Sequence, residues 1–238
     1  MSAEKSMGVK ETKNFSANAP NYTELVGNAV RFSGLQVDFF TRAKALLLSE
    51  LATAHFGEQG GLNLLDVGCG IGLLHSLLDE RQFVITGTDV AEGALMLANS
   101  RNPNATYQYY DGSRLPFDDD TFDMSLTVCV MHHILPTMRD NYLREMQRVT
   151  RTGGLICVIE HNPVNPITRL AVMRCTFDSD AILLSSREVQ KRFIRVGLKA
   201  PRTRFFLLLP FLGKLARRME TNLSWLHLGA QYCVSVVV

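Results

Sequence analysis

The stretch that decides the fold is residues 64–74, whose sequence is LLDVGCGIGLL. An apolar run ends at Asp66, and glycines follow at positions 68, 70 and 72. An apolar strand that leads into a glycine-rich turn and then a helical pattern is typical of the first strand of an open α/β sheet, whose ligand-binding loop lies at the strand's carboxyl end. Because glycine has no Cβ, such a bend can adopt a left-handed backbone and admit a ligand close to the main chain.

The spacing of these glycines separates several classes of nucleotide-binding loop. It is G-x-G-x-G, whereas the dinucleotide fingerprint is G-x-G-x-x-G and a P-loop needs Gly-Lys-Ser or Gly-Lys-Thr, so NAD-dependent oxidoreduction is disfavoured. With an aspartate two positions before the first glycine, the pattern resembles motif I of class I S-adenosylmethionine (SAM) dependent methyltransferases, in particular the small-molecule, type 11-like group. The resemblance implies that Asp66, Gly68, Gly70 and Gly72 lie under the methionine part of SAM.

A second acidic residue supports this resemblance. Residues 83–90, FVITGTDV, predict a buried strand that ends at Asp89. This residue follows the glycines by about twenty positions, the spacing at which a Rossmann-like unit places a carboxylate against ribose hydroxyls. Such a carboxylate accepts charge-assisted hydrogen bonds from both hydroxyls. The alternative is an aspartate that caps the helix starting near Ala91.

A third motif is YQYYDGS, residues 107–113, which predicts a short strand ending at Asp111 and Gly112. It resembles the segment of small-molecule methyltransferases in which an acidic residue after the third strand faces the adenine amino group. The resemblance, which covers residues 60–160, implies that Asp111 accepts from adenine N6 and that the Gly112 amide donates to a ring nitrogen. The predicted cofactor-binding set is completed by Val90, Ser113, Cys129 and Tyr22.

Composition agrees with a soluble α/β protein. Of 238 residues, 46% are hydrophobic, and no apolar run approaches the roughly 18 residues that span a bilayer. The polar N-terminus lacks the apolar region of a secretory signal, so we expect a cytoplasmic protein. Five scattered cysteines without a C-x-x-C pair favour buried thiols in a reducing compartment. The net charge of +2 and the lack of a known binding module argue against a nucleic-acid partner.

Alternating strand and helix patterns predict an α/β fold with right-handed crossovers. The resemblance implies a Rossmann-like, seven-stranded, mostly parallel sheet with helices on both faces and an antiparallel last hairpin. We expect residues 1–56 to form an N-terminal lid and cap helices, and residues 57–238 to form the SAM-binding domain. Later strands are expected near 83–89, 106–110, 122–128, 155–160, 203–209 and 231–238, and helices near 45–56, 72–80, 91–100, 140–150 and 185–197.

Two histidine-containing segments provide candidates for acid–base chemistry. His132 and His133 follow the fourth strand, and Glu160 and His161 end the fifth. Because SAM supplies the reactive carbon, the protein mostly positions and desolvates the reactants, but a hydroxyl or carbon acid also needs a base. We expect His133 or His161 to be that base, with Glu160 orienting a histidine or the substrate. Alternatively, these histidines only cap a helix or contact the sulfonium region. A metal site built from His132, His133 and His161 is conceivable, but no metal is required and the spacing of the histidines is unspecific, so no metal ion is expected.

Three further segments each have two interpretations. The proline-rich loop 160–169 is either a rigid connector or a functional loop with Asn162 and Asn165 at the cleft mouth. The basic stretch 187–218 is either a solvated face or a weak contact for an anionic substrate or membrane surface. The N-terminal NFSANAPNY, with Phe15 and Tyr22, resembles a segment that closes over the cofactor, and the alternative is a disordered terminus.

These observations predict a SAM-dependent methyltransferase that acts on an O, N or C nucleophile of a small biosynthetic molecule, such as a glycan or a secondary metabolite. Two alternatives remain open. One is a membrane-surface methyltransferase for a lipid-linked quinone or glycan, and the other is a non-catalytic SAM-binding domain.

Overall fold

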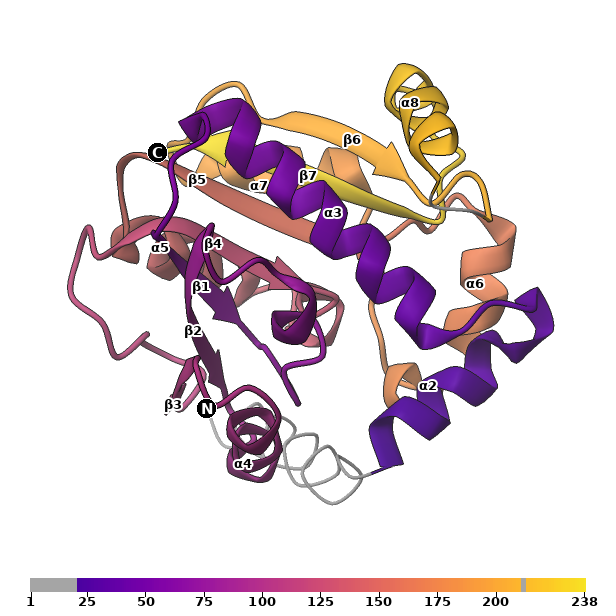
Figure 1. Cartoon of the computed structure of the whole chain (residues 1–238), viewed down its shortest axis with the longest axis horizontal. Coiled ribbons are helices and arrows are strands. Elements are labelled where there is room, and N and C mark those ends of the chain that lie inside the picture. Colours follow the sequence, from indigo (N-terminus) through magenta and orange to yellow (C-terminus); the bar gives the residue numbers. More distant parts are fainter. Residues whose placement is uncertain (1–20, 211–212) are drawn as a thin grey trace.

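A seven-stranded sheet forms the centre of the computed structural model, which describes residues 21–210 and 213–238 (Figure 1). The strand order is β3-β2-β1-β4-β5-β7-β6. The strands are β1 Leu62–Val67, β2 Phe83–Asp89, β3 Thr106–Tyr109, β4 Phe122–Val128, β5 Thr150–His161, β6 Arg202–Phe206 and β7 Gln231–Val237. β1 to β5 pair in parallel, and β7 runs antiparallel to both β5 and β6. The predicted Rossmann-like sheet and its antiparallel last hairpin are confirmed.

Helices cover both faces of this sheet. They are α2 Tyr22–Val30, α3 Val37–Phe56, α4 Glu92–Arg101, α5 Arg139–Val149, α6 Pro166–Arg174, α7 Ser186–Arg195 and α8 Lys214–Leu223. Short 3-10 turns are η2 Arg31–Ser33, η3 His75–Leu77, η4 Met131–His133 and η5 Thr176–Asp178. In Figure 1, α3 crosses the near face, whereas α5 and α7 lie behind the sheet.

The alternation of side chains along the strands builds two separate cores. In β1, Leu64 belongs to the apolar cluster under α3, and the next residue, Leu65, belongs to the cluster under α5 and α7. This is the two-residue period of a pleated strand that is buried on both faces. Leu48 of α3 and Phe193 of α7 are fully buried against these two faces. Packing on both faces fixes the position of each strand in the sheet. It therefore also fixes the sheet edge at which the parallel strands end.

Several expected elements differ from the structure. The helix expected over 72–80 is a turn with only η3, because Gly72 has a φ of +67° and Leu78 is already extended at a ψ of 143°. The strand β5 starts at Thr150, before the Gly153-Gly154 pair that was expected to precede it. The strand β6 ends at Phe206, since Leu207 takes a left-handed φ of +58°. Helices α6 and α8 were not expected.

The N-terminal region is only partly described. Helices α2 and α3 are present before the sheet, and α2 packs against α6 (Figure 1). Phe15 and the rest of the expected lid lie outside the described residues, and the division into residues 1–56 and 57–238 stays a prediction. No helix within 21–210 or 213–238 is long and apolar enough to cross a bilayer. All five cysteines are free, as expected.

Candidate active site

The carboxyl ends of the parallel strands bring the predicted site residues to one edge of the sheet. Asp66 is the last residue but one of β1, and Asp89 ends β2. Cys129 follows β4, and His161 ends β5. Because β1 lies between β2 and β4, the chain changes direction across the sheet at this point. Open α/β sheets bind their ligands at such a switch point.

The glycine bend after β1 requires its glycines for two reasons. Gly68, Gly70 and Gly72 have φ values of +81°, +54° and +67°, a region that favours glycine. A Cβ on Gly68 would also lie 2.5 Å from Val130 Cγ2, and one on Gly72 would lie 2.7 Å from Asn102 Nδ2. The bend is therefore fitted against the chain after β4 and against the end of α4.

A buried polar chain that sequence reasoning missed lies behind this bend. His75 Nε2 donates to Asp66 Oδ2 at 3.0 Å, and His75 Nδ1 lies 2.7 Å from the Tyr107 hydroxyl. That hydroxyl also accepts from Asn102 Nδ2 at 3.1 Å. Burial raises the pKa of Tyr107 to about 12. In the sequence, the feature that could have indicated this buried chain is a histidine within the apolar stretch LLHSLL.

Asp89 ties the bend to the next helix. Its Oδ2 accepts from the Gly70 amide at 2.8 Å, and its Oδ1 accepts from the Ala91 amide at 2.9 Å. Burial raises the pKa of this carboxyl, and the amide donors oppose that shift. The contact to the Ala91 amide agrees with the alternative interpretation, in which Asp89 caps the helix that starts near Ala91. A carboxylate has about four acceptor sites, so these bonds leave room for the predicted ribose contact.

Asp111 lies on an exposed turn after β3. Its Oδ1 accepts from the Ser113 amide at 2.9 Å and from the Ser113 hydroxyl, which lowers the pKa of Asp111. Gly112 sits between them with a φ of +83°. Ser113, which was predicted to bind the cofactor, thus stabilises the turn in this structure. Val90, the residue after β2, is half-buried against the core.

The histidines after β4 form a cluster with two carboxylates. His132 Nδ1 lies 2.6 Å from Glu160 Oε2, and His132 Nε2 lies 3.3 Å from Asp178 Oδ1. His133 Nε2 lies 3.5 Å from the same Asp178 oxygen. The side chains of His132 and Glu160 are each 1% exposed, whereas His133 is 33% exposed. Glu160 therefore orients His132. It does not orient His133 or His161, the two candidate bases.

The charges in this cluster are distributed unevenly. Burial disfavours a charged His132, but Glu160 and Asp178 outweigh burial and raise its pKa well above the usual value. In spite of its own burial, Asp178 has a pKa lowered to about 2 by His132. Burial, and then the charge of His132, lower the pKa values of His133 and His161 to about 4. The carboxylates thus favour the charged form of His132, and burial favours the neutral forms of His133 and His161.

Two of the residues that complete the cluster were not predicted. Asp178 comes from η5 and is 46 positions from His132, so no local pattern marks it. Gln231, at the start of β7, places its Nε2 3.4 Å from His161 Nδ1 and 3.5 Å from Cys129 Sγ. Cys129 has a φ of +56°, a left-handed conformation that costs a non-glycine residue energy and that often occurs at functional sites.

The loop 160–169 is a connector. Asn162 Nδ2 donates to the carbonyls of His227 and Gly229, and Asn165 Nδ2 donates to the Leu228 carbonyl. Asn165 is also the N-cap of α6. The expectation that these two amides face the cleft mouth is wrong, because both hold the chain before β7 in place.

The basic stretch 187–218 is partly neutralised within the chain. Arg192 and Arg195 bind the two oxygens of Asp140 at 2.6 and 2.9 Å. Arg204 binds Glu50 at 2.6 Å. The structure does not describe the side chains of Lys214, Arg217 and Arg218, nor that of Tyr22. For Arg192, Arg195 and Arg204 the positive charge has a partner inside the fold.

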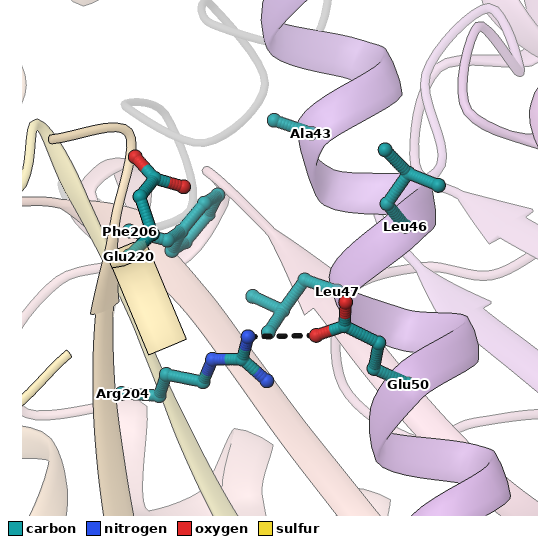
Figure 2. Close-up of a pocket in the computed structure, with 7 residues that line it drawn as sticks. All are labelled: Ala43, Leu46, Leu47, Glu50, Arg204, Phe206 and Glu220. Carbon is teal, nitrogen blue, oxygen red and sulfur yellow. Dashed lines mark ion pairs between the residues drawn. The ribbon is translucent and has the colours of Figure 1, made fainter. Parts of the chain in front are cut away.

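A small pocket lies away from the strand ends, between α3, β6 and α8 (Figure 2). Arg204 and Glu50 point toward one another across it, and Leu47 and Phe206 contribute apolar walls. None of the predicted site residues lines this pocket. It is therefore separate from the predicted cofactor site.

Residues 65–158 match the family model described as a methyltransferase domain. The chain contains a class I SAM-dependent methyltransferase domain. The matched region runs from β1 to β5 and includes the glycine bend, Asp89, Asp111 and the two adjacent histidines. SAM is the cofactor of this domain.

The methyltransferase domain has relatives of differing activity. The chain is 32% identical over 148 residues to malonyl-[acyl-carrier protein] O-methyltransferase of Serratia marcescens, covering 61% of this chain and 53% of that protein. It is 34% identical over 119 residues to phthiotriol/phenolphthiotriol dimycocerosates methyltransferase of Mycobacterium tuberculosis, covering 48% and 43%. The chain thus spans about half the length of the curated relatives it matches.

Solved structures show the same fold. A SAM-dependent methyltransferase of Thermotoga maritima, described as a possible histamine N-methyltransferase, superposes with a TM-score of 0.65 at 16% identity over 94% of this chain and 97% of that one. Haemonchus contortus phosphoethanolamine N-methyltransferase 2 in complex with SAM has a TM-score of 0.56 at 16% identity, over 80% of this chain and 51% of that one.

The residues at the strand ends of this domain fit SAM. Asp66 and Asp89 place two buried carboxylates on neighbouring strands, on either side of a bend with no side chains at three positions. Asp66 Oδ1 is buried and has no hydrogen-bond partner among the described residues. A buried polar atom without a partner is costly, and a donor on a bound ligand would remove that cost.

Proposed function

We propose that the chain is an active methyltransferase that transfers the methyl group of SAM to an O, N or C atom of a small biosynthetic molecule. The observation that supports this most is that one sheet edge holds both the acidic glycine bend of β1 and β2 and the histidine cluster of β4 and β5. When bound, SAM supplies the electrophilic methyl carbon and a sulfide leaving group. The chain itself has to bind, orient and desolvate the reactants.

We assign the cofactor contacts to the predicted residues. Asp89 accepts from the ribose hydroxyls, and Asp111 and the Gly112 amide bind adenine. The bend lies under the methionine part, which is zwitterionic and needs both donors and acceptors. The remaining members of the proposed set are Asp66, Gly68, Gly70, Gly72, Val90, Ser113, Cys129 and Tyr22.

The proton of an acceptor hydroxyl or amine would pass to His133 or His161. Both are free bases at neutral pH, because their pKa values are lowered to about 4. Each offers a nitrogen lone pair for the proton that the acceptor loses as the methyl bond forms. His132 is not assigned this role, since each of its ring nitrogens already faces a carboxylate, Glu160 or Asp178.

The test measures cofactor binding and turnover separately. The full chain is titrated with SAM by calorimetry, and S-adenosylhomocysteine is then measured by mass spectrometry after incubation with a panel of phenolic, carboxylic and amine acceptors. We expect binding and acceptor-dependent product, with His161→Gln reducing turnover more than affinity. Binding without product from any acceptor would favour a non-catalytic SAM-binding domain.

A second candidate is methylation of a lipid-linked acceptor at a membrane surface. Three large apolar side chains are exposed in the segments that follow β5 and precede β7: Ile167 at 58%, Trp225 at 70% and Leu228 at 60%. Ile167 and Leu228 are neighbours, because Asn165 binds the amide of one and the carbonyl of the other. Exposed apolar patches often mark ligand or membrane contacts.

We also propose a cytoplasmic location, which the five free thiols support.

A further inference from the structure

We propose that His132, His133 and Asp178 bind one divalent first-row transition-metal ion beside the methyl-transfer site. Each of the three offers one ligand atom, and these atoms all lie within 4.8 Å of one another. Two imidazole nitrogens and a carboxylate oxygen form a donor set that suits zinc, iron, cobalt or nickel. The site is built by η4 and η5, and the chain after η5 is tied to η4 because the Ile182 amide donates to the His132 carbonyl at 2.8 Å.

The two distances from Asp178 to the histidines match a metal site better than direct charge-assisted hydrogen bonds. Asp178 Oδ1 lies 3.3 Å from His132 Nε2 and 3.5 Å from His133 Nε2. A charge-assisted N–H···O bond is usually about 2.7–2.9 Å long. A tetrahedral ion with bonds of about 2.0–2.1 Å separates its ligand atoms by roughly 3.4 Å.

The other nitrogen of His132 has the partner that a metal-binding histidine needs. His132 Nδ1 is 2.6 Å from Glu160 Oε2, so the Nδ1–H donates to a carboxylate, and Nε2 lies beside Asp178 Oδ1. An ion bound there would displace the Nε2 proton and take its place between the two groups. A carboxylate–histidine–metal arrangement of this kind fixes the ring and raises its basicity as a ligand. Glu160 is thus a positioning residue for the ion.

The formal charge and access of the cluster also suit a dication. Two carboxylates, Glu160 and Asp178, lie beside His132, and the charge of a divalent ion balances both. His133 is 33% exposed, which gives the ion a path from solvent. Three protein ligands leave a four-coordinate ion one position for water or for an acceptor oxygen or nitrogen. With the ion bound, His133 is a ligand, and His161 is the remaining base of the proposed function. The use of the open position in methyl transfer depends on that function, whereas binding of the ion does not.

The structure changes the ligand set that the sequence suggested. The sequence offers three histidines, but His161 Nδ1 is 3.4 Å from Gln231 Nε2 and lies outside the group of converging ligand atoms. Asp178 takes its place. This difference gives the proposal a direct test, because Asp178 and His161 can be replaced separately.

The experiment measures metal binding by the full chain. Chelator-treated protein is titrated with Zn²⁺ by calorimetry, and Co²⁺ is added in parallel to record its d–d absorption. We expect one Zn²⁺ per chain and the absorption of a four-coordinate Co²⁺. His133→Ala and Asp178→Ala should abolish binding at micromolar Zn²⁺, and Glu160→Gln should weaken it by about 10–100-fold. Circular dichroism checks that each variant is folded. If Asp178→Ala does not fold, Asp178→Asn is measured in its place.

Two variants serve as matched controls. His161→Gln and His55→Gln each remove a histidine outside the ligand set and should bind Zn²⁺ as the wild type does. The proposal is overturned if the wild type binds no Zn²⁺, if folded Asp178 or His133 variants bind it unchanged, or if His161→Gln abolishes binding. A thiolate-to-Co²⁺ charge-transfer band would place Cys129 among the ligands and would also overturn the assigned set. None of these readouts depends on methyl transfer.

Discussion

Asp66 and His75 form a buried pair in which His75 Nε2 lies 3.0 Å from Asp66 Oδ2, directly behind the glycine bend. The aspartate of the strand and the histidine of the following turn therefore position each other. This pair fixes the carboxylate whose second oxygen has no partner among the described residues. The bend thus has a polar support as well as its glycines.

Replacing His75 by Phe should weaken both the fold and the cofactor site. The variant leaves a buried carboxylate without its donor, which costs about 3 kcal/mol of unfolding free energy. Urea unfolding measures that loss, and calorimetry with SAM measures the affinity. Tyr107→Phe is the matched control, because it removes the hydroxyl that lies beside His75 Nδ1 and leaves the contact between His75 and Asp66. An equal loss in both variants would contradict the account.

Replacing Gly68 by Ala should destabilise the chain by more than left-handed strain alone. Strain at a φ of +81° costs roughly 1–2 kcal/mol, and the new Cβ also meets Val130 Cγ2 at 2.5 Å. Gly153→Ala is the control, since Gly153 has a similar φ of +77° and nothing within 4 Å of an added Cβ. Thermal unfolding should show the larger loss for Gly68→Ala and a partial rescue by Val130→Ala. Equal losses at the two glycines would rule out the packing explanation.

Glu145 should stabilise the loop after Asp111 in a pH-dependent way. Its Oε2 accepts from Arg148 at 2.8 Å and from the Leu115 amide at 2.9 Å, and mainly Arg148 lowers the pKa of Glu145. Because the folded-state pKa is lower than the unfolded one, the stabilisation is complete above the unfolded value of about 4.3. It is lost as the pH falls through the folded value.

Glu145→Gln tests this sign. We expect the variant to be about 1 kcal/mol less stable than the wild type at pH 7. Urea unfolding over a pH series should show the difference shrinking in acid. A difference that stays constant, or that grows as the pH falls, would show that the ion pair with Arg148 is not its source.

Binding to anionic vesicles should distinguish apolar from basic contacts. If the exposed Ile167, Trp225 and Leu228 bind lipid, co-sedimentation should persist at high salt and fall in Trp225→Ser. If the exposed bases of 187–218 bind it, salt should abolish sedimentation. Since Arg192, Arg195 and Arg204 bind carboxylates within the chain, we expect the salt-resistant result when binding occurs. Absence of sedimentation at any salt would remove the membrane-surface candidate.

The sequence predicted those parts of the fold that local patterns determine. The strands β2 and β4 have the expected bounds, 83–89 and 122–128. The sequence of β2 begins with three apolar residues and ends at Asp89, and that of β4 alternates apolar with polar residues. The helix over 72–80 was wrong, since burial of His75 against Asp66 and Tyr107 requires a turn there. A pattern within one segment does not contain that contact.

The candidate site shows the same division. His132, His133, Glu160 and His161 lie at the strand ends where the sequence placed them. Which of them pair was not predictable, because Asp178 and Gln231 come from other elements and decide the arrangement. The roles of Asn162 and Asn165 also depended on a distant partner, the loop before β7.

The most direct test of the account is a calorimetric titration of the full chain with SAM, repeated with Asp89→Ala. The account predicts that the wild type binds one SAM per chain and that Asp89→Ala binds at least about 10-fold more weakly, a loss of roughly 1.4 kcal/mol. Absence of SAM binding by the folded wild type, or unchanged affinity in the variant, would contradict the proposed placement of SAM at the strand ends.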